Sequence, residues 1–155
     1  MREGKFKWVG PLAEKKIGLY AKADSTIKLE KIEEARKFLI GVQRSGHGMQ
    51  YLKARGFKNF DPSTKPIANL RKLLRGNNDL WFSSNATIAG NCRRVNVKNC
   101  QAKIKLVLLV ENTFMSIAFN KQTPDSVIDL WQGTYDALYR GGIIKKILKA
   151  HGLLS

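Results

Sequence analysis

The segment from Phe38 to Leu52 most constrains what this chain can fold into. It begins with six uncharged residues, 38–43, continues through Ser45 and Gly46, and ends in a short helix-forming run. The uncharged run predicts a strand buried on both faces of a parallel sheet. Ser45 and Gly46 suit a tight turn at a helix N-terminus. A strand that enters a helix in this way leaves backbone N–H groups at the carboxyl edge of a sheet, where open α/β sheets bind anionic ligands.

The known phosphate-binding motifs do not explain this turn. Gly41 and Gly46 have the spacing of a P-loop, but His47 and Gly48 stand where that motif needs Lys and Ser or Thr. Residues 46–48 are not a dinucleotide fingerprint either. The turn is therefore either a ligand-binding edge or an ordinary strand-to-helix connection, and the local sequence alone favours the ordinary connection.

The remaining chain alternates between predicted strands and helices, with Gly10-Pro11 and Asp61-Pro62 expected to end strands. A second strand-to-helix turn is expected at 83–85. The predicted strands are 6–9, 17–21, 57–60, 79–82, 104–110 and 114–119, and the predicted helices are 29–37, 67–74, 125–139 and 143–150. This alternation predicts an α/β fold built on a sheet.

The charge is strongly positive, with 28 Lys and Arg against 12 Asp and Glu and a formal net charge of +16. Such a balance favours acidic partners, including nucleic acid. The basic residues are spread along the chain, with local groups in 71–75, 93–98 and 145–149, and no RNA-binding aromatic motif or zinc-finger spacing accompanies them. A solvated basic surface is the preferred explanation, and a basic nucleic-acid-binding protein is the alternative function.

The sequence offers no catalytic or metal-binding constellation. Its two histidines are His47 and His151, and no motif joins either to a nucleophile or to metal ligands. We therefore expect no enzymatic activity, no cofactor and no metal. No apolar run is long enough to insert into a membrane, and residues 1–5 lack the apolar core of a signal peptide.

Two cysteines, Cys92 and Cys100, enclose seven polar and basic residues. In an oxidising compartment they are able to form a disulfide, whereas in the cytoplasm they would remain thiols. The sequence leaves both states open.

Several motifs, in order and spacing, resemble those of one family. They are Arg2-x-x-x-Phe6-x-Trp8-Val9-Gly10-Pro11, Leu19-Tyr20-Ala21-Lys22, Ile40-Gly41-Val42-x-Arg44-Ser45-Gly46, Asn69-Leu70-x-x-Leu73-Leu74-x-Gly76, Asp79-Leu80-Trp81, Ile117-Ala118-Phe119-Asn120-Lys121 and Thr123-Pro124-Asp125. Together they resemble the bacterial extracellular solute-binding proteins of the amino-acid-binding type (family 3), which serve ABC importers.

The resemblance implies a periplasmic-binding-protein-like bilobal α/β fold, with one complete lobe and part of the other. Residues 24–111 would form lobe two. Residues 1–23 would be the hinge and the late part of lobe one, and residues 112–155 the hinge and the C-terminal return to lobe one. The early part of lobe one has no counterpart, so we expect a truncated protein or a fragment. The implied function is to bind a small polar solute, such as an amino acid or a related carboxylate, in the periplasm and to deliver it to a membrane permease.

The resemblance also assigns ligand-binding residues. Arg2 matches the arginine that holds the α-carboxylate of the ligand, although a frayed terminal residue is the alternative. Gln43, Ser45, Gly46 and His47 match the lobe-two turn that contacts the ligand. Ser84 stands where the family commonly has an acid for the ligand's amino group, and a serine cannot neutralise an ammonium. This difference argues against a plain α-amino acid as the ligand.

Overall fold

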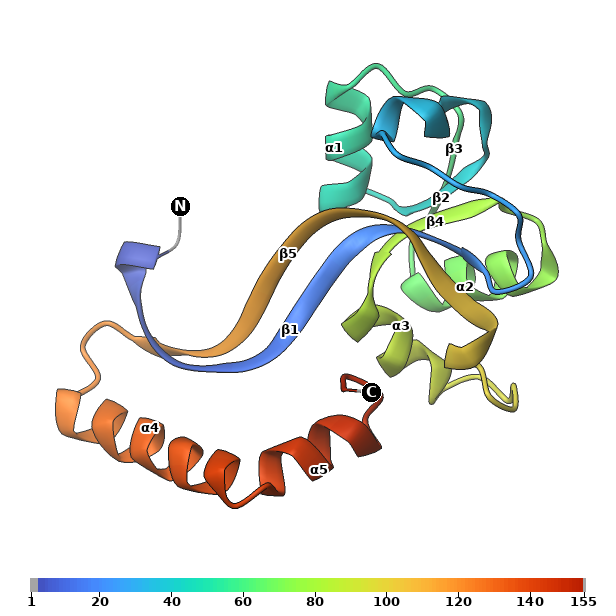
Figure 1. Cartoon of the computed structure of the whole chain (residues 1–155). Coiled ribbons are helices and arrows are strands. Elements are labelled where there is room, and N and C mark those ends of the chain that lie inside the picture. Colours follow the sequence, from blue (N-terminus) through green and yellow to red (C-terminus); the bar gives the residue numbers. More distant parts are fainter. Residues whose placement is uncertain (1–2, 155) are drawn as a thin grey trace. The chain divides into compact units, whose positions relative to one another are not determined.

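The computed structural model describes residues 3–154, which form two compact units (Figure 1). Unit 2 comprises Lys16–Asn112, and unit 1 comprises the described residues 3–15 together with 113–154. The strands β1 (Phe6–Lys22) and β5 (Ile104–Asn120) each contribute residues to both units. None of the described helices combines the length and the apolar character needed to cross a membrane.

Unit 2 is organised around a five-stranded sheet with the order β3-β2-β4-β1-β5. Here β2 (Ile40–Gln43) lies between β3 (Phe60–Ser63) and β4 (Leu80–Ser84) and is parallel to both, whereas β1 is antiparallel to β4. The parallel strands lead into α1 (His47–Ala54), α2 (Pro66–Arg75) and α3 (Asn85–Cys92). The predicted buried parallel strand at 38–43 is confirmed, since residues 40–42 are all buried.

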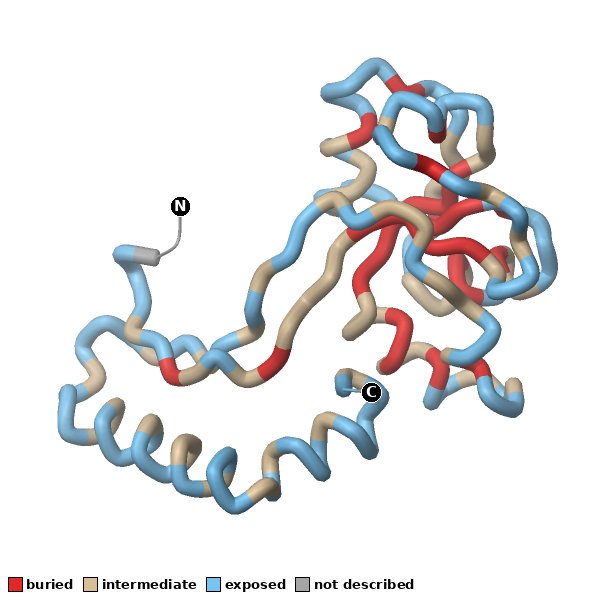
Figure 2. Tube along the Cα trace, viewed as in Figure 1, coloured by how far each residue is buried: buried red, intermediate tan, exposed pale blue. Residues whose placement is uncertain are grey.

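Each face of this sheet carries its own hydrophobic cluster, because successive strand residues point to opposite faces. Ile40, Val42 and Phe82 belong to one cluster, and Tyr20 and Trp81 belong to the other. Figure 2 shows that the buried residues of unit 2 gather on the strands and on the helices that cover them.

Tyr20 places a polar atom in the second cluster and finds a partner for it. Its hydroxyl donates a hydrogen bond to the Lys16 carbonyl oxygen at 2.8 Å. Burial raises the pKa of Tyr20 to about 12, opposed by a weaker hydrogen bond with the Asn85 backbone. Burial thus disfavours the charged phenolate form of Tyr20.

A disulfide joins Cys92 to Cys100 across a Cα–Cα distance of 5.5 Å. Both half-cystines are buried against the Trp81 cluster, and the bridge closes the loop between α3 and the 3₁₀ helix η3 (Gln101–Lys103). The question that the sequence left open is thereby answered in favour of the oxidised pair.

Unit 1 places α4 (Asp125–Arg140) against the first half of β1, and α5 (Ile143–Ala150) follows α4. Polar contacts fix α4 to the strand. The Gly10 N–H donates to Gln132 Oε1 at 3.0 Å, the Tyr135 hydroxyl donates to the Pro11 carbonyl at 2.5 Å, and Lys7 Nζ lies 2.5 Å from Asp125 Oδ1. The short 3₁₀ helix η1 (Glu3–Lys5) precedes β1.

The predicted strand ends at Gly10-Pro11 and Asp61-Pro62 are wrong. β1 continues through Gly10, whose N–H bonds to a side chain of α4 instead of a neighbouring strand. Asp61 and Pro62 lie inside β3, the outermost strand, where a residue without an N–H is tolerated. The segments 104–110 and 114–119 likewise form one strand, β5, in place of two.

The helix expected at 29–37 is also shorter than predicted. Only η2 (Ile32–Lys37) forms, and it is a 3₁₀ helix. Glu34 Oε2 accepts a hydrogen bond from the Glu30 N–H at 2.9 Å, which fixes the residues before η2 in a turn. The apolar spacing of 29–37 predicted burial correctly for Leu29 and Ala35, but not the helix type or its start.

Candidate functional site

The candidate site lies at the carboxyl edge of the unit 2 sheet. β2 and β4 are parallel neighbours in the register Ile40 beside Leu80 and Gly41 beside Trp81. Their last residues, Gln43 and Ser84, therefore reach the same edge. The structure thus brings the predicted residues of 43–47 and Ser84 to one edge of the sheet, whereas Arg2 lies outside the described residues.

The turn after β2 is fixed by its own backbone. Ser45 has a left-handed conformation with φ 58°, and the Gly46 N–H donates to the Gln43 carbonyl at 3.0 Å. The Arg44 N–H donates to the Ser63 carbonyl at 2.9 Å, which joins the turn to the end of β3. Gly46 is the N-cap of α1 and provides no side-chain cap. The first N–H groups of α1 are consequently suited to receive an oxygen atom of a ligand.

His47 begins α1 and is exposed to solvent. Its Nε2 lies 3.7 Å from Glu111 Oε2 of β5. Its ring centroid lies 6.5 Å from that of Phe82 and 6.2 Å from that of Tyr51, and the Arg55 guanidinium lies 3.6 Å from the Tyr51 centroid. The rings of Tyr51 and Phe82 and the carboxylate of Glu111 therefore lie beside the turn.

The sequence analysis predicted neither Glu111 nor the rings of Tyr51 and Phe82 beside His47. Glu111 follows a run of apolar strand residues, and no motif links it to His47, 64 positions earlier. Only the pairing order of the strands, which puts β5 at the end of the sheet, determines where Glu111 lies. The sequence marks Glu111 only as the sole acidic residue in 104–120.

Ser84 caps a helix, in addition to the ligand contact that the sequence predicts for it. It is buried, and as the N-cap of α3 its Oγ accepts a hydrogen bond from the Thr87 N–H at 3.2 Å and donates one to Thr87 Oγ1 at 3.0 Å. A ligand would have to share this hydroxyl with the helix cap. The contact between Ser84 and a ligand remains a prediction.

Gly48 supports the geometry of the turn, because α1 approaches β4 closely there. A Cβ atom at Gly48 would lie 2.3 Å from Phe82 Cδ1. We expect Gly48→Ala to lower the free energy of unfolding by about 1–2 kcal/mol, since overpacking costs roughly 1–3 kcal/mol and the better helix propensity of alanine returns at most about 1 kcal/mol. Urea unfolding followed by circular dichroism measures the change.

A matched control lies in α3. Gly90 is also a helical glycine, but an added Cβ there meets nothing within 4 Å. Gly90→Ala should therefore raise the free energy of unfolding by about 0.5–1 kcal/mol. Equal effects of the two substitutions would contradict the close approach of α1 to Phe82.

The described residues hold no group of three or more His, Cys, Asp or Glu side chains placed to share a metal ion. What the edge does provide is backbone N–H groups, a helix N-terminus, a carboxylate and aromatic rings. Together these are able to bind a small polar molecule through hydrogen bonds and stacking.

No family model and no curated protein matches the sequence. Solved structures do match it. The L-cystine solute receptor of Neisseria gonorrhoeae aligns with a TM-score of 0.73 at 18% identity, over 97% of this chain and 62% of that one. The second substrate-binding domain of a putative amino acid ABC transporter from Streptococcus pneumoniae aligns with a TM-score of 0.70 at 16% identity, over 98% and 67%. A histidine kinase sensor domain with similarity to periplasmic binding proteins aligns with a TM-score of 0.67 at 19% identity, over 99% of this chain and 66% of that one.

These similarities establish the fold. The chain is an α/β protein that matches part of the periplasmic-binding-protein fold, as the sequence predicted, and it spans about two thirds of the length of the solved chains. Similar structures described as a solute receptor and a substrate-binding domain are binding proteins rather than enzymes.

Proposed function

We propose that this chain, which has the α/β fold of amino-acid-binding periplasmic proteins, is the solute-binding component of an ABC importer or a part of that component. It would act in the periplasm without catalysis and deliver its solute to a membrane permease. In this proposal residues 24–111 are lobe two, and 1–23 and 112–155 are the hinge and part of lobe one. The proposal rests on one observation: the 43–47 turn and Ser84 lie at the same edge of the sheet in this fold. The disulfide suits an oxidising compartment.

The turn is proposed to bind the carboxylate of the solute. The N-terminus of α1 offers N–H groups and the positive end of the helix dipole. In this proposal Gln43, Ser45, Gly46 and His47 contact the carboxylate, and Arg2 contributes a guanidinium, which suits a carboxylate.

Glu111 is proposed to fill the role that Ser84 cannot. A serine hydroxyl leaves an ammonium uncompensated, whereas the Glu111 carboxylate lies beside His47 at the same edge. A zwitterionic solute could therefore place its carboxylate at α1 and its ammonium near Glu111. Tyr51, whose ring centroid lies 5.5 Å from that of the buried Phe82, would pack against its side chain.

The test is calorimetry of the chain against amino acids, carboxylates and neutral polar solutes. We expect one or more zwitterions to bind, and Glu111→Gln to weaken them about 10- to 100-fold, which corresponds to the roughly 1.5–3 kcal/mol of a hydrogen bond to a charged group. Arg2→Ala should weaken carboxylate-bearing solutes by a similar factor.

Glu33→Gln is the matched control, because Glu33 is an acid on the exposed surface of η2 in the same unit. It should leave affinity unchanged within twofold. Failure of every solute to bind would contradict the proposed function, and binding that tolerates Glu111→Gln would contradict the proposed site. Binding of DNA or RNA that weakens steeply with added salt would instead support the nucleic-acid alternative, because counterion release makes such binding strongly salt-dependent.

A further inference from the structure

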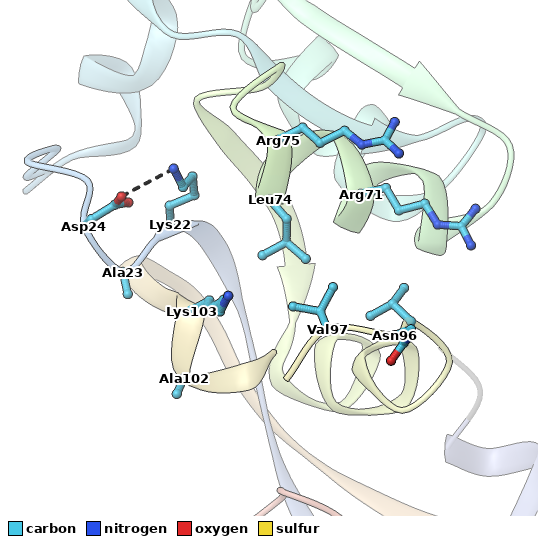
Figure 3. A pocket seen from close by; sticks show the side chains of 11 residues that line it. Lys22, Ala23, Asp24, Arg71, Leu74, Arg75, Asn96, Val97, Ala102 and Lys103 are labelled. Carbon is cyan, nitrogen blue, oxygen red and sulfur yellow. Dashed lines mark ion pairs between the residues drawn. The ribbon is translucent and has the colours of Figure 1, made fainter. Parts of the chain in front are cut away.

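Unit 2 has a pocket of about 710 Å³ that shares no residue with the candidate solute site. Its lining residues come from three segments that are distant in the sequence, and Figure 3 shows their side chains. One is the C-terminal half of α2, one is the disulfide loop at 95–97, and one is formed by residues 22–24 at the end of β1 together with Ala102 and Lys103 of η3. The Ala23 N–H donates to the Lys103 carbonyl at 2.8 Å, which fixes the third segment.

The rim of this pocket is cationic. Arg71 and Arg75 lie one helical turn apart on α2, and Lys22 and Lys103 lie on the opposite segment. The single acid among the lining residues, Asp24, is paired with Lys22 at 3.3 Å.

The two arginines are not neutralised by the protein itself. Both are exposed, and neither forms an ion pair with any residue in the described range 3–154. Like charges at positions i and i+4 of a helix repel each other by a few tenths of a kcal/mol, roughly 0.2–0.5. An anion held between them would relieve this repulsion, and a guanidinium fork suits a phosphate or carboxylate.

The floor of the pocket is aliphatic. Leu74, Val95 and Val97 line it, and all three also pack against the Trp81 cluster. The Cys92–Cys100 disulfide closes the loop that carries Val95 and Val97. The pocket therefore joins a cationic rim to an apolar surface, part of which lies on a loop closed by a disulfide.

We propose that this pocket binds a small organic anion that carries a phosphate or similar doubly charged group on an aliphatic body. The charged group lies between Arg71 and Arg75, and the aliphatic part covers Leu74 and the two valines. This site is independent of the solute site at the carboxyl edge, because its residues come from different segments.

Hexyl phosphate is the probe. Inorganic phosphate tests the contribution of the charged group alone, and hexanol tests that of the aliphatic chain alone. We expect hexyl phosphate to bind at least tenfold more tightly than phosphate in calorimetry, and hexanol to show no binding. The variant Arg71→Gln/Arg75→Gln should weaken hexyl phosphate at least tenfold. Circular dichroism of the variant should match that of the parent chain, because both side chains are exposed.

Lys145→Gln/Lys146→Gln is the control, since it removes the same charge from α5 of unit 1. It should change the affinity for hexyl phosphate less than twofold. Equal losses of affinity for hexyl phosphate in the two double variants would mean that only net charge matters, which would overturn the proposal. No binding of hexyl phosphate, or a preference for short single-stranded DNA that depends on Arg71 and Arg75, would also overturn it. Loss of solute binding by Glu111→Gln bears only on the other site.

Discussion

Trp81→Ala should lower the free energy of unfolding of unit 2 by about 3–5 kcal/mol, the usual cost of truncating a buried aromatic side chain. Trp81 is 1% exposed and is the largest fully buried side chain of the chain's described part. It lies on β4 between Tyr20 of β1 and Gly41 of β2, and its ring packs in the cluster with Leu70 and Leu73. The large cavity left by alanine would lie between the sheet and α2, beside Leu70 and Leu73.

Amide hydrogen exchange of residues 40–43 and 80–84 measures this change within unit 2 alone. Trp131→Ala is the control, because Trp131 is 49% exposed on α4 of unit 1 and has one edge-on aromatic neighbour, Phe119. Its loss should cost less than the loss of Trp81, because only about half of the Trp131 side chain is buried, and it should leave exchange in unit 2 unchanged. Comparable costs for the two tryptophans would contradict the core assigned to Trp81.

Removing the disulfide should lower the free energy of unfolding by about 2–3 kcal/mol, as loop-closure entropy predicts for a loop of this length. The variant Cys92→Ser/Cys100→Ser combines this loss with the burial of two hydroxyl groups, since both half-cystines are buried. Cys92→Ala/Cys100→Ala avoids the hydroxyl groups and isolates the effect of the bond. The measurement is the midpoint of urea unfolding with and without a reductant.

A reductant should destabilise the parent chain and leave the alanine variant unchanged. It should also weaken hexyl phosphate binding, because the loop that carries Val95 and Val97 loses its closure. A parent chain that is insensitive to reductant would contradict a structural role of the bond.

Much of unit 2 could be predicted from local patterns. The buried strand at 40–43, the helix after residue 66 with its end at Gly76, and the strand at 80–84 all follow from apolar runs and glycine positions. Strand continuity could not be predicted in this way. Gly10-Pro11 is a typical strand end, yet β1 passes through it because Gln132, 122 positions later, accepts the Gly10 hydrogen bond.

The 43–47 turn and Ser84 of the candidate site could be predicted from motifs, whereas Glu111 could not. The 43–47 turn is one segment, and a resemblance of motifs identified it. Glu111 and Phe82 reach the turn through the order of the strands, and the cap of α3 by Ser84 depends on Thr87 three residues later. Arg71 and Arg75 appeared in the sequence as one more basic group, because only the folded chain places the disulfide loop and Lys103 across from them.

The two outermost strands of the unit 2 sheet differ in what they offer to another polypeptide. β3 has four residues, contains Pro62, and carries Asp61 in an ion pair with Lys72 at 2.6 Å. Short length, proline and charge are features that block the addition of a further strand. β5 is long, lies last in the order of the described strands, and exposes Leu106 and Leu109. Self-association through strand addition would therefore begin along β5, and a lysine at position 106 or 109 is the substitution that would suppress it.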